Sequence, residues 1–266
     1  YIRRPLETTQ GMRVPAIYVA NPYMLECNED WYVPHDVDRD VSPYPQQHIT
    51  ESDITFDPST VSFPQPRYPR ATVGYADTAP TEEIPLDCIS DWYSYFNSRG
   101  YASVFCGGLG TRGSQGFNCC GSPEETAAFK AVIDWLNGRC RAFTNLTDNI
   151  EIRADWCTGK VAMSGKSYLG TMCIAVASTG VEGLETIIPE AAISNWYDYY
   201  RCNGLNLPAI GWQGDDLDIL AKYCFSRAKD PEDYASVREA YAAWLEGIAA
   251  DEDRDSGNYS RWWDMR

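Results

Sequence analysis

The sequence predicts an α/β fold with a mainly parallel sheet, flanking helices and a helical cap. Apolar strand-like runs alternate with helix-like segments from about residue 91 to 190, which is typical of βαβ units. Residues 161–170 read as a buried strand, a sharp turn and the start of a helix. Aromatic and helix-like segments follow from residue 195, and a cap over the carboxyl edge of the sheet would suit them.

Composition limits the possible partners and cofactors. The 266 residues suffice for one large domain with a substantial core. The net charge of -16 argues against nucleic acid and anionic membranes as partners, and no run approaches the roughly 18 apolar residues of a membrane span. The two histidines and ten cysteines show no metal-ligand spacing, so we expect no metal and no cofactor. We expect free thiols in a reducing cytoplasm.

The first 90 residues contain one predicted strand and a long insertion. Apolar residues alternate within residues 1–25, and this strand ends at Asn21-Pro22-Tyr23. Tyr23 is either a core tyrosine or a hydroxyl donor at a site. Residues 26–90 are rich in Pro, Asp, Ser and Tyr and predict a partly irregular surface insertion. Both histidines, His35 and His48, lie there, and we expect them to be solvated and not to act as catalytic bases.

Regular structure is predicted to resume at residue 91. A short helix is expected over 91–100 and a strand over 101–106. The glycine-rich segment 107–113 lacks the spacing of a phosphate-binding loop, so a flexible loop is expected. Ser122 to Glu125 has the pattern of a capping box with proline at the first helical position, and Gly138 would end that helix.

The turn at Ser167 is the strongest candidate for chemistry. A serine between a buried strand and a helix presents its hydroxyl beside the free N–H groups of that helix, which is the nucleophile elbow. Gly165 would relieve crowding at this turn. A phosphate loop is the first alternative, but its spacing fails because position 160 is lysine. An ordinary strand-to-helix turn is the second, because the closing glycine of G-x-S-x-G arrives one residue late.

The remainder of the chain predicts one more strand and the cap. The strand covers 184–188, and a helix starts at Pro231. We divide the chain into a sheet-bearing part, residues 1–194, and a cap, residues 195–266. The acidic stretch 251–255 is expected to be a solvated turn, and most cap aromatics are expected to be core residues.

Several segments resemble a known family. Residues 131–139, 159–171, 180–185, 196–200 and 203–205 strongly resemble the X-prolyl dipeptidyl aminopeptidases. These belong to the α/β-hydrolase group, which also holds cocaine-esterase-like and acylase enzymes. The elbow of that group is G-x-S-Y-x-G, which Gly165, Ser167, Tyr168 and Gly170 match. The resemblance accounts for the late glycine and implies an α/β-hydrolase fold.

The resemblance also implies a mechanism. Ser167 would attack the carbonyl of a proline at position two of a peptide and form an acyl-enzyme, and water would then release the Xaa-Pro dipeptide. The backbone N–H of Tyr168 and the hydroxyl of Tyr23 would stabilise the oxyanion. The chain would thus be part of a serine exopeptidase.

Three further residues are implied to bind substrate. Asp215 lies where the family has an acidic residue that faces the free ammonium of the peptide, although glutamate is more frequent there and aspartate reaches less far. Trp196 and Tyr199 would form hydrophobic walls around the proline ring. The expected partners are proline-containing peptides.

The catalytic triad is incomplete in this sequence. The fold orders its triad Ser, Asp, His, and no histidine follows residue 48. We therefore expect the chain to be a fragment of a catalytic domain that is inactive alone, and a homodimer at full length. An esterase or acylase of the same group and a non-catalytic relative stay open as alternatives.

Overall fold

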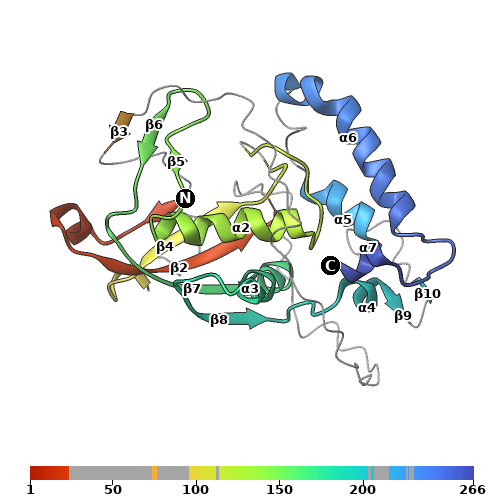
Figure 1. Ribbon diagram of the computed structural model, residues 1–266, viewed down its shortest axis with the longest axis horizontal. Helices are drawn as coiled ribbons and strands as arrows, with labels where there is room; N and C mark the ends of the chain where they lie inside the picture. The colour runs from red at the N-terminus through yellow and green to blue at the C-terminus, as the bar shows by residue number, and fades with distance from the viewer. Residues whose placement is uncertain are drawn as a thin grey trace.

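The computed structural model of the chain contains a central sheet, two helices packed on it and a group of helices beyond one end of its strands (Figure 1). It describes residues 1–23, 74–76, 96–111, 114–202, 205–206, 216–225, 227 and 231–266. The layers match the predicted α/β class.

The central sheet has five strands in the spatial order β1-β4-β2-β7-β8. They are β1 (Ile2–Arg3), β2 (Val14–Asn21), β4 (Ala102–Gly107), β7 (Cys157–Lys166) and β8 (Leu184–Glu190). The four longer strands run parallel, and β1 is antiparallel to β4. The predicted mainly parallel sheet is therefore confirmed. Strand β2 is apolar and buried over most of its length, as expected for a parallel strand covered on both faces.

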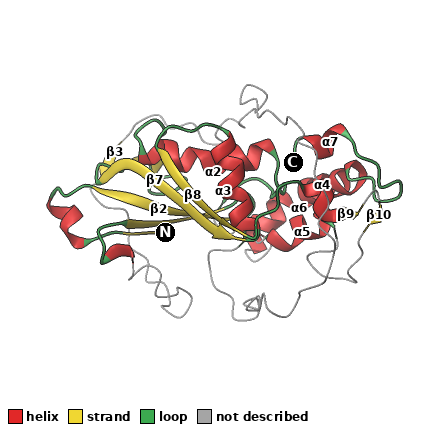
Figure 2. Cartoon of the chain, turned by 90° about the horizontal axis from the view of Figure 1, so that it is seen from below, coloured by secondary structure: helices red, strands yellow, loops and turns green. Residues whose placement is uncertain are grey.

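Helices α2 (Pro123–Leu136) and α3 (Tyr168–Ser178) lie on the same side of the sheet (Figure 2). The side chain of Ser122 caps α2 by accepting a hydrogen bond from the N–H of Glu125 at 3.3 Å. The helix ends just before Gly138, whose φ of 74° lies in the left-handed region that favours glycine. Both predicted ends of this helix are confirmed.

A small second sheet was not predicted. It joins β3 (Gly74–Ala76), β6 (Ile150–Ile152) and β5 (Ala142–Phe143) in the order β3-β6-β5. Strands of two or three residues are too short to leave a periodic signal. Strand β3 belongs to the expected insertion 26–90, and the rest of that insertion lies outside the described residues. The helix expected over 91–100 is described only from residue 96. A 3-10 helix, η1 (Leu6–Gln10), and the short pair β9 (Arg201–Cys202) and β10 (Leu205–Asn206) complete the strands and turns.

Four helices lie beyond the carboxyl ends of β2 and β8 (Figure 1). They are α4 (Trp196–Tyr200), α5 (Leu217–Cys224), α6 (Pro231–Asp251) and α7 (Arg261–Asp264). The stacked rings of Phe225 and Tyr241, with centroids 3.7 Å apart, join the end of α5 to α6. The predicted helix start at Pro231 is confirmed, and the division of the chain at residue 194 stays an interpretation. Within the described ranges, no helix is long and apolar enough to cross a membrane.

Candidate active site

The backbone at Ser167 is strained in the way that a nucleophile elbow requires. Ser167 has φ 59° and ψ -126°, a conformation that costs a residue with a side chain about 1–3 kcal/mol. The turn is held on both sides. The Ser167 N–H donates to the carbonyl oxygen of Glu190 at 2.8 Å, and the Thr171 N–H donates to the Ser167 carbonyl at 2.9 Å. Because an ordinary strand-to-helix turn needs no such strain and Ser167 is exposed, the geometry favours the elbow.

Two glycines allow the strand, turn and helix to approach closely. A Cβ on Gly165 would lie 2.6 Å from the Cβ of Leu169, and a Cβ on Gly170 would lie 2.7 Å from the carbonyl oxygen of Glu190. Neither distance leaves room for a side chain. The late glycine of the motif is therefore needed at position 170, where α3 passes the end of β8.

Tyr168 places its backbone at the start of α3 and its side chain beneath the turn. The side chain is buried, and its hydroxyl lies 2.7 and 2.8 Å from the two carboxylate oxygens of Glu125. Burial, with the nearby charge of Glu125 among the smaller causes, raises the pKa of Tyr168 well above its ordinary value of 10. The hydroxyl is therefore a hydrogen-bond donor at neutral pH.

Edge contacts between rings join four predicted site residues. The ring of Tyr168 meets that of Tyr23 at a centroid distance of 5.7 Å and that of Trp196 at 5.0 Å. Trp196 in turn meets Tyr199 at 6.4 Å. Trp196 is 3% exposed, whereas Tyr199 is 50% exposed. The structure thus joins these four residues by ring contacts that include Tyr168, the residue after Ser167, and Tyr199 is the most exposed of the four.

Tyr23 follows the carboxyl end of β2. Its backbone N–H donates to the side-chain oxygen of Asn21 at 2.9 Å, which fixes the turn out of the strand. Burial, followed by the proximity of Cys224 and Cys120, raises the pKa of Tyr23 above its ordinary value. A protonated, partly buried hydroxyl is what an oxyanion donor requires.

Glu125 is a residue of this site that sequence analysis missed. The capping-box prediction is correct for the side chain of Ser122, which caps the helix. It is wrong for Glu125, whose carboxylate would accept from the N–H of Ser122 in a capping box but accepts from the N–H of Gly121 at 2.6 Å. The side chain is fully buried, and burial raises its pKa to about 7. A signal was present in the sequence, because Glu125 shares a helix face with the buried Phe129 and Ile133, four and eight residues further on.

Three predicted or considered residues lie outside the described residues. They are Asp215, His35 and His48, so the ammonium-binding role of Asp215 stays a prediction. Within the residues that the structure describes, no group of three His, Cys, Asp or Glu side chains could hold a metal ion.

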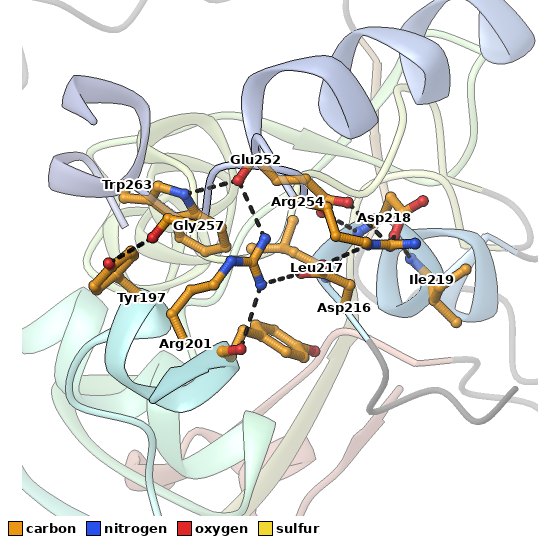
Figure 3. Close-up of polar contacts among 11 residues, drawn as sticks. Tyr197, Arg201, Asp216, Leu217, Asp218, Ile219, Glu252, Arg254, Gly257 and Trp263 are labelled. Carbon is orange, nitrogen blue, oxygen red and sulfur yellow. Dashed lines mark hydrogen bonds and ion pairs between the residues drawn. The ribbon is translucent and has the colours of Figure 1, made fainter. Parts of the chain in front are cut away.

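A buried network of charges ties the cap helices together (Figure 3). Arg201, whose side chain is fully buried, donates to Asp216 Oδ1 at 2.9 Å and to the carbonyl oxygen of Glu252 at 3.1 Å. Its guanidinium also lies over the ring of Trp263, 4.9 Å from the centroid. The network therefore joins the residues after α4, before α5 and after α6.

Glu252 corrects one sequence prediction. Residues 251–255 were expected to form a solvated turn, but Glu252 is 1% exposed. Its carboxylate accepts from Arg254 at 3.1 Å and from the N–H of Asp218 at 3.1 Å. Burial, together with the charges of Asp216 and Asp218, raises the pKa of Glu252 to about 8. One partner, Asp218, lies 34 residues away in sequence, and a local pattern does not reveal it.

Comparisons with known proteins agree with the resemblance seen in the sequence. The family model described as X-Pro dipeptidyl-peptidase (S15 family) matches residues 1–266. The chain is 44% identical over 267 residues to the Xaa-Pro dipeptidyl-peptidase of Pediococcus pentosaceus, covering 100% of the chain and 32% of that protein. It is 43% identical over 265 residues to that of Lacticaseibacillus casei, covering 100% and 33%. The chain thus spans about a third of the length of these relatives. A CocE/NonD family hydrolase from Staphylococcus aureus aligns with a TM-score of 0.44 and 16% identity, over 77% of this chain and 27% of that one.

Proposed function

The chain belongs to the X-Pro dipeptidyl-peptidase (S15) family, and on that premise we propose that the protein at its natural length is a serine exopeptidase that releases Xaa-Pro dipeptides from peptide N-termini. The observation that carries the proposal is the strained, exposed Ser167 at the start of α3. An esterase or acylase of the same fold would share this turn, so substrate choice decides between them.

In the proposed reaction, the Ser167 oxygen bonds to the carbonyl carbon of the proline residue, and the peptide C–N bond breaks. The serine proton passes through a general base to the leaving amine, and water then hydrolyses the acyl-enzyme. The N–H of Tyr168 and the hydroxyl of Tyr23 would stabilise the oxyanion. One such donor is typically worth about 3 kcal/mol of barrier.

Trp196 and Tyr199 would form the hydrophobic walls around the substrate's proline ring. Tyr199 would offer its exposed face, with the buried Trp196 packed against its edge. Asp215 would bind the free ammonium, since a desolvated charge pair rejects N-blocked peptides.

Activity is proposed for the natural-length protein and not for the 266 residues alone. No histidine follows residue 48, whereas the fold places its triad histidine after the serine and the aspartate. Turnover by the isolated chain that Ser167→Ala abolishes would contradict this part of the proposal. We also propose a homodimer, which light scattering of the natural-length protein tests.

The cytoplasm is the proposed compartment. Among the described residues, seven cysteines are free thiols, which suits a reducing environment. Thiol titration of protein purified without reductant tests this.

The deciding experiment compares Gly-Pro p-nitroanilide with its N-acetylated form as substrates of the natural-length protein, with Ser167→Ala as the control. Cleavage of the free amine alone supports the dipeptidyl peptidase. Equal cleavage of both would overturn it in favour of an esterase or acylase. Failure of a fluorophosphonate to label Ser167 would indicate a non-catalytic relative.

A further inference from the structure

Glu125 lies directly behind the elbow. It is in the first turn of α2, and its side chain is 0% exposed. Both carboxylate oxygens accept from the hydroxyl of Tyr168, at 2.7 and 2.8 Å, and one accepts from the N–H of Gly121 at 2.6 Å. Asn118 Nδ2 lies 3.3 Å from the other. All three donors are uncharged groups.

Helix capping does not explain this arrangement. An acidic residue in the first turn of a helix stabilises the helix without the need for full burial. Here the carboxylate points into the core, where burial opposes its charge. The hydrogen bond from the Gly121 N–H stabilises the start of α2, whereas those from Tyr168 and Asn118 serve another purpose.

Tyr168 connects Glu125 to the reaction centre in two ways. Its N–H is the proposed backbone donor to the oxyanion, and its ring contacts those of Tyr23 and Trp196. Fixing the Tyr168 hydroxyl fixes the far end of a rigid side chain. It therefore restrains the Ser167–Tyr168 peptide and the ring that packs against that of Tyr23.

We propose that Glu125 is a positioning residue for acyl transfer, which orients the oxyanion-binding groups by holding the hydroxyl of Tyr168. This inference rests on the proposed function of Ser167 as the nucleophile. A misplacement of about 1 Å at a reacting centre reduces rates by about 100-fold. Greater freedom of the Tyr168 side chain should therefore lower the rate of acylation of Ser167.

Glu125 is the group at this site that titrates near neutral pH, because the neighbouring thiols and the Tyr168 hydroxyl stay protonated there. Burial raises the pKa of the Cys119 and Cys120 thiols far above their ordinary values, so both stay protonated. Tyr168 stays protonated for the same reason. Arg266, at the end of the chain, contributes a charge that favours ionised Glu125.

The test uses the natural-length protein with Glu125→Gln, Tyr168→Phe and the double variant. Glu151→Gln is the matched control, since Glu151 is also buried, at 8% exposure, but lies in the small sheet with Arg141 and Arg153. Two rates are measured per folded active site, counted by complete fluorophosphonate labelling. They are the rate of labelling of Ser167 and the turnover of Gly-Pro p-nitroanilide.

Glu125→Gln and Tyr168→Phe are each expected to lower kcat and the labelling rate by about 10- to 100-fold, with KM within about threefold. The double variant should lose no more than the worse single variant, because both changes break the same contact. Glu151→Gln should leave both rates unchanged. Unchanged rates in Glu125→Gln, or losses that multiply in the double variant, would overturn the inference. Fluorophosphonate labelling of Ser167 distinguishes failure of the peptidase proposal from failure of the proposed role of Glu125. If the wild type labels but does not cleave the anilide, the peptidase proposal fails, while the labelling rates still decide the role of Glu125.

Discussion

Replacing Glu125 by glutamine should change how the free energy of unfolding depends on pH. The direction of the change follows from the burial of the Glu125 carboxyl group. Burial raises the pKa of Glu125 from 4.5 to about 7, and the hydrogen bonds from Gly121 and Tyr168 offset this only in part. The folded protein therefore holds this proton more tightly than the unfolded chain does. The stability that this carboxyl group contributes is complete below pH 4.5 and is lost as pH rises through 7.

The size of the effect follows from the pKa difference. A tenfold change in proton affinity is worth about 1.4 kcal/mol, so ionising Glu125 destabilises the fold by about 3 kcal/mol. Glutamine does not ionise. Part of this change lies outside the assayed range, so relative to wild type Glu125→Gln should gain about 2.5 kcal/mol between pH 5 and 8. A domain of this size changes its Tm by about 2–4 °C per kcal/mol.

The assay is thermal unfolding of wild type and variant at half-unit steps from pH 5 to 8. The variant's Tm relative to wild type should rise steadily across this range. Glu151→Gln provides a control without this slope. Burial alone would raise the pKa of Glu151, but hydrogen bonds from Arg141 and Arg153 lower it from its ordinary value of 4.5. Its contribution to stability is therefore nearly complete at pH 5, and the Tm of that variant relative to wild type should stay nearly constant from pH 5 to 8. A constant difference for Glu125→Gln, or one that falls with pH, would refute the reasoning.

Three further changes test the elbow and the cap. Ser167→Gly should be about 1–3 kcal/mol more stable than Ser167→Ala, because glycine adopts a φ of 59° without strain, and equal Tm values would contradict this. Gly170→Ala should abolish fluorophosphonate labelling of Ser167, since the new Cβ would lie 2.7 Å from the carbonyl oxygen of Glu190. Labelling at the wild-type rate would count against the close approach. Arg201→Met should destabilise the protein by about 3 kcal/mol in denaturant unfolding, because it removes a buried partner of Asp216. A loss well under 1 kcal/mol would mean that Arg254 holds Asp216 alone.

The elements that follow from local sequence were predictable, and those that depend on distant partners were not. The strand, turn and helix around Ser167 are encoded within about 20 consecutive residues, and so are both ends of α2. The buried positions of Glu125 and Glu252 depend on partners 43 and 34 residues away in the chain. An acidic side chain gives no local sign of such burial except its place on an apolar helix face.

The strained backbone of Ser167 and the buried carboxyl group of Glu125 both adjoin the same residue, Tyr168. Each lowers stability, and neither is needed to build the sheet, because a glycine at 167 and a glutamine at 125 would fit the same backbone. What each provides is orientation. The strained turn exposes the hydroxyl of Ser167. The buried carboxylate of Glu125 holds Tyr168, whose backbone N–H follows Ser167 in the chain. Strain and a buried charge are thus both present at the proposed site, as expected where function competes with stability. It also separates them from core residues, whose replacement should reduce stability and labelling together. At neutral pH, relief of strain or of charge should raise stability while labelling falls.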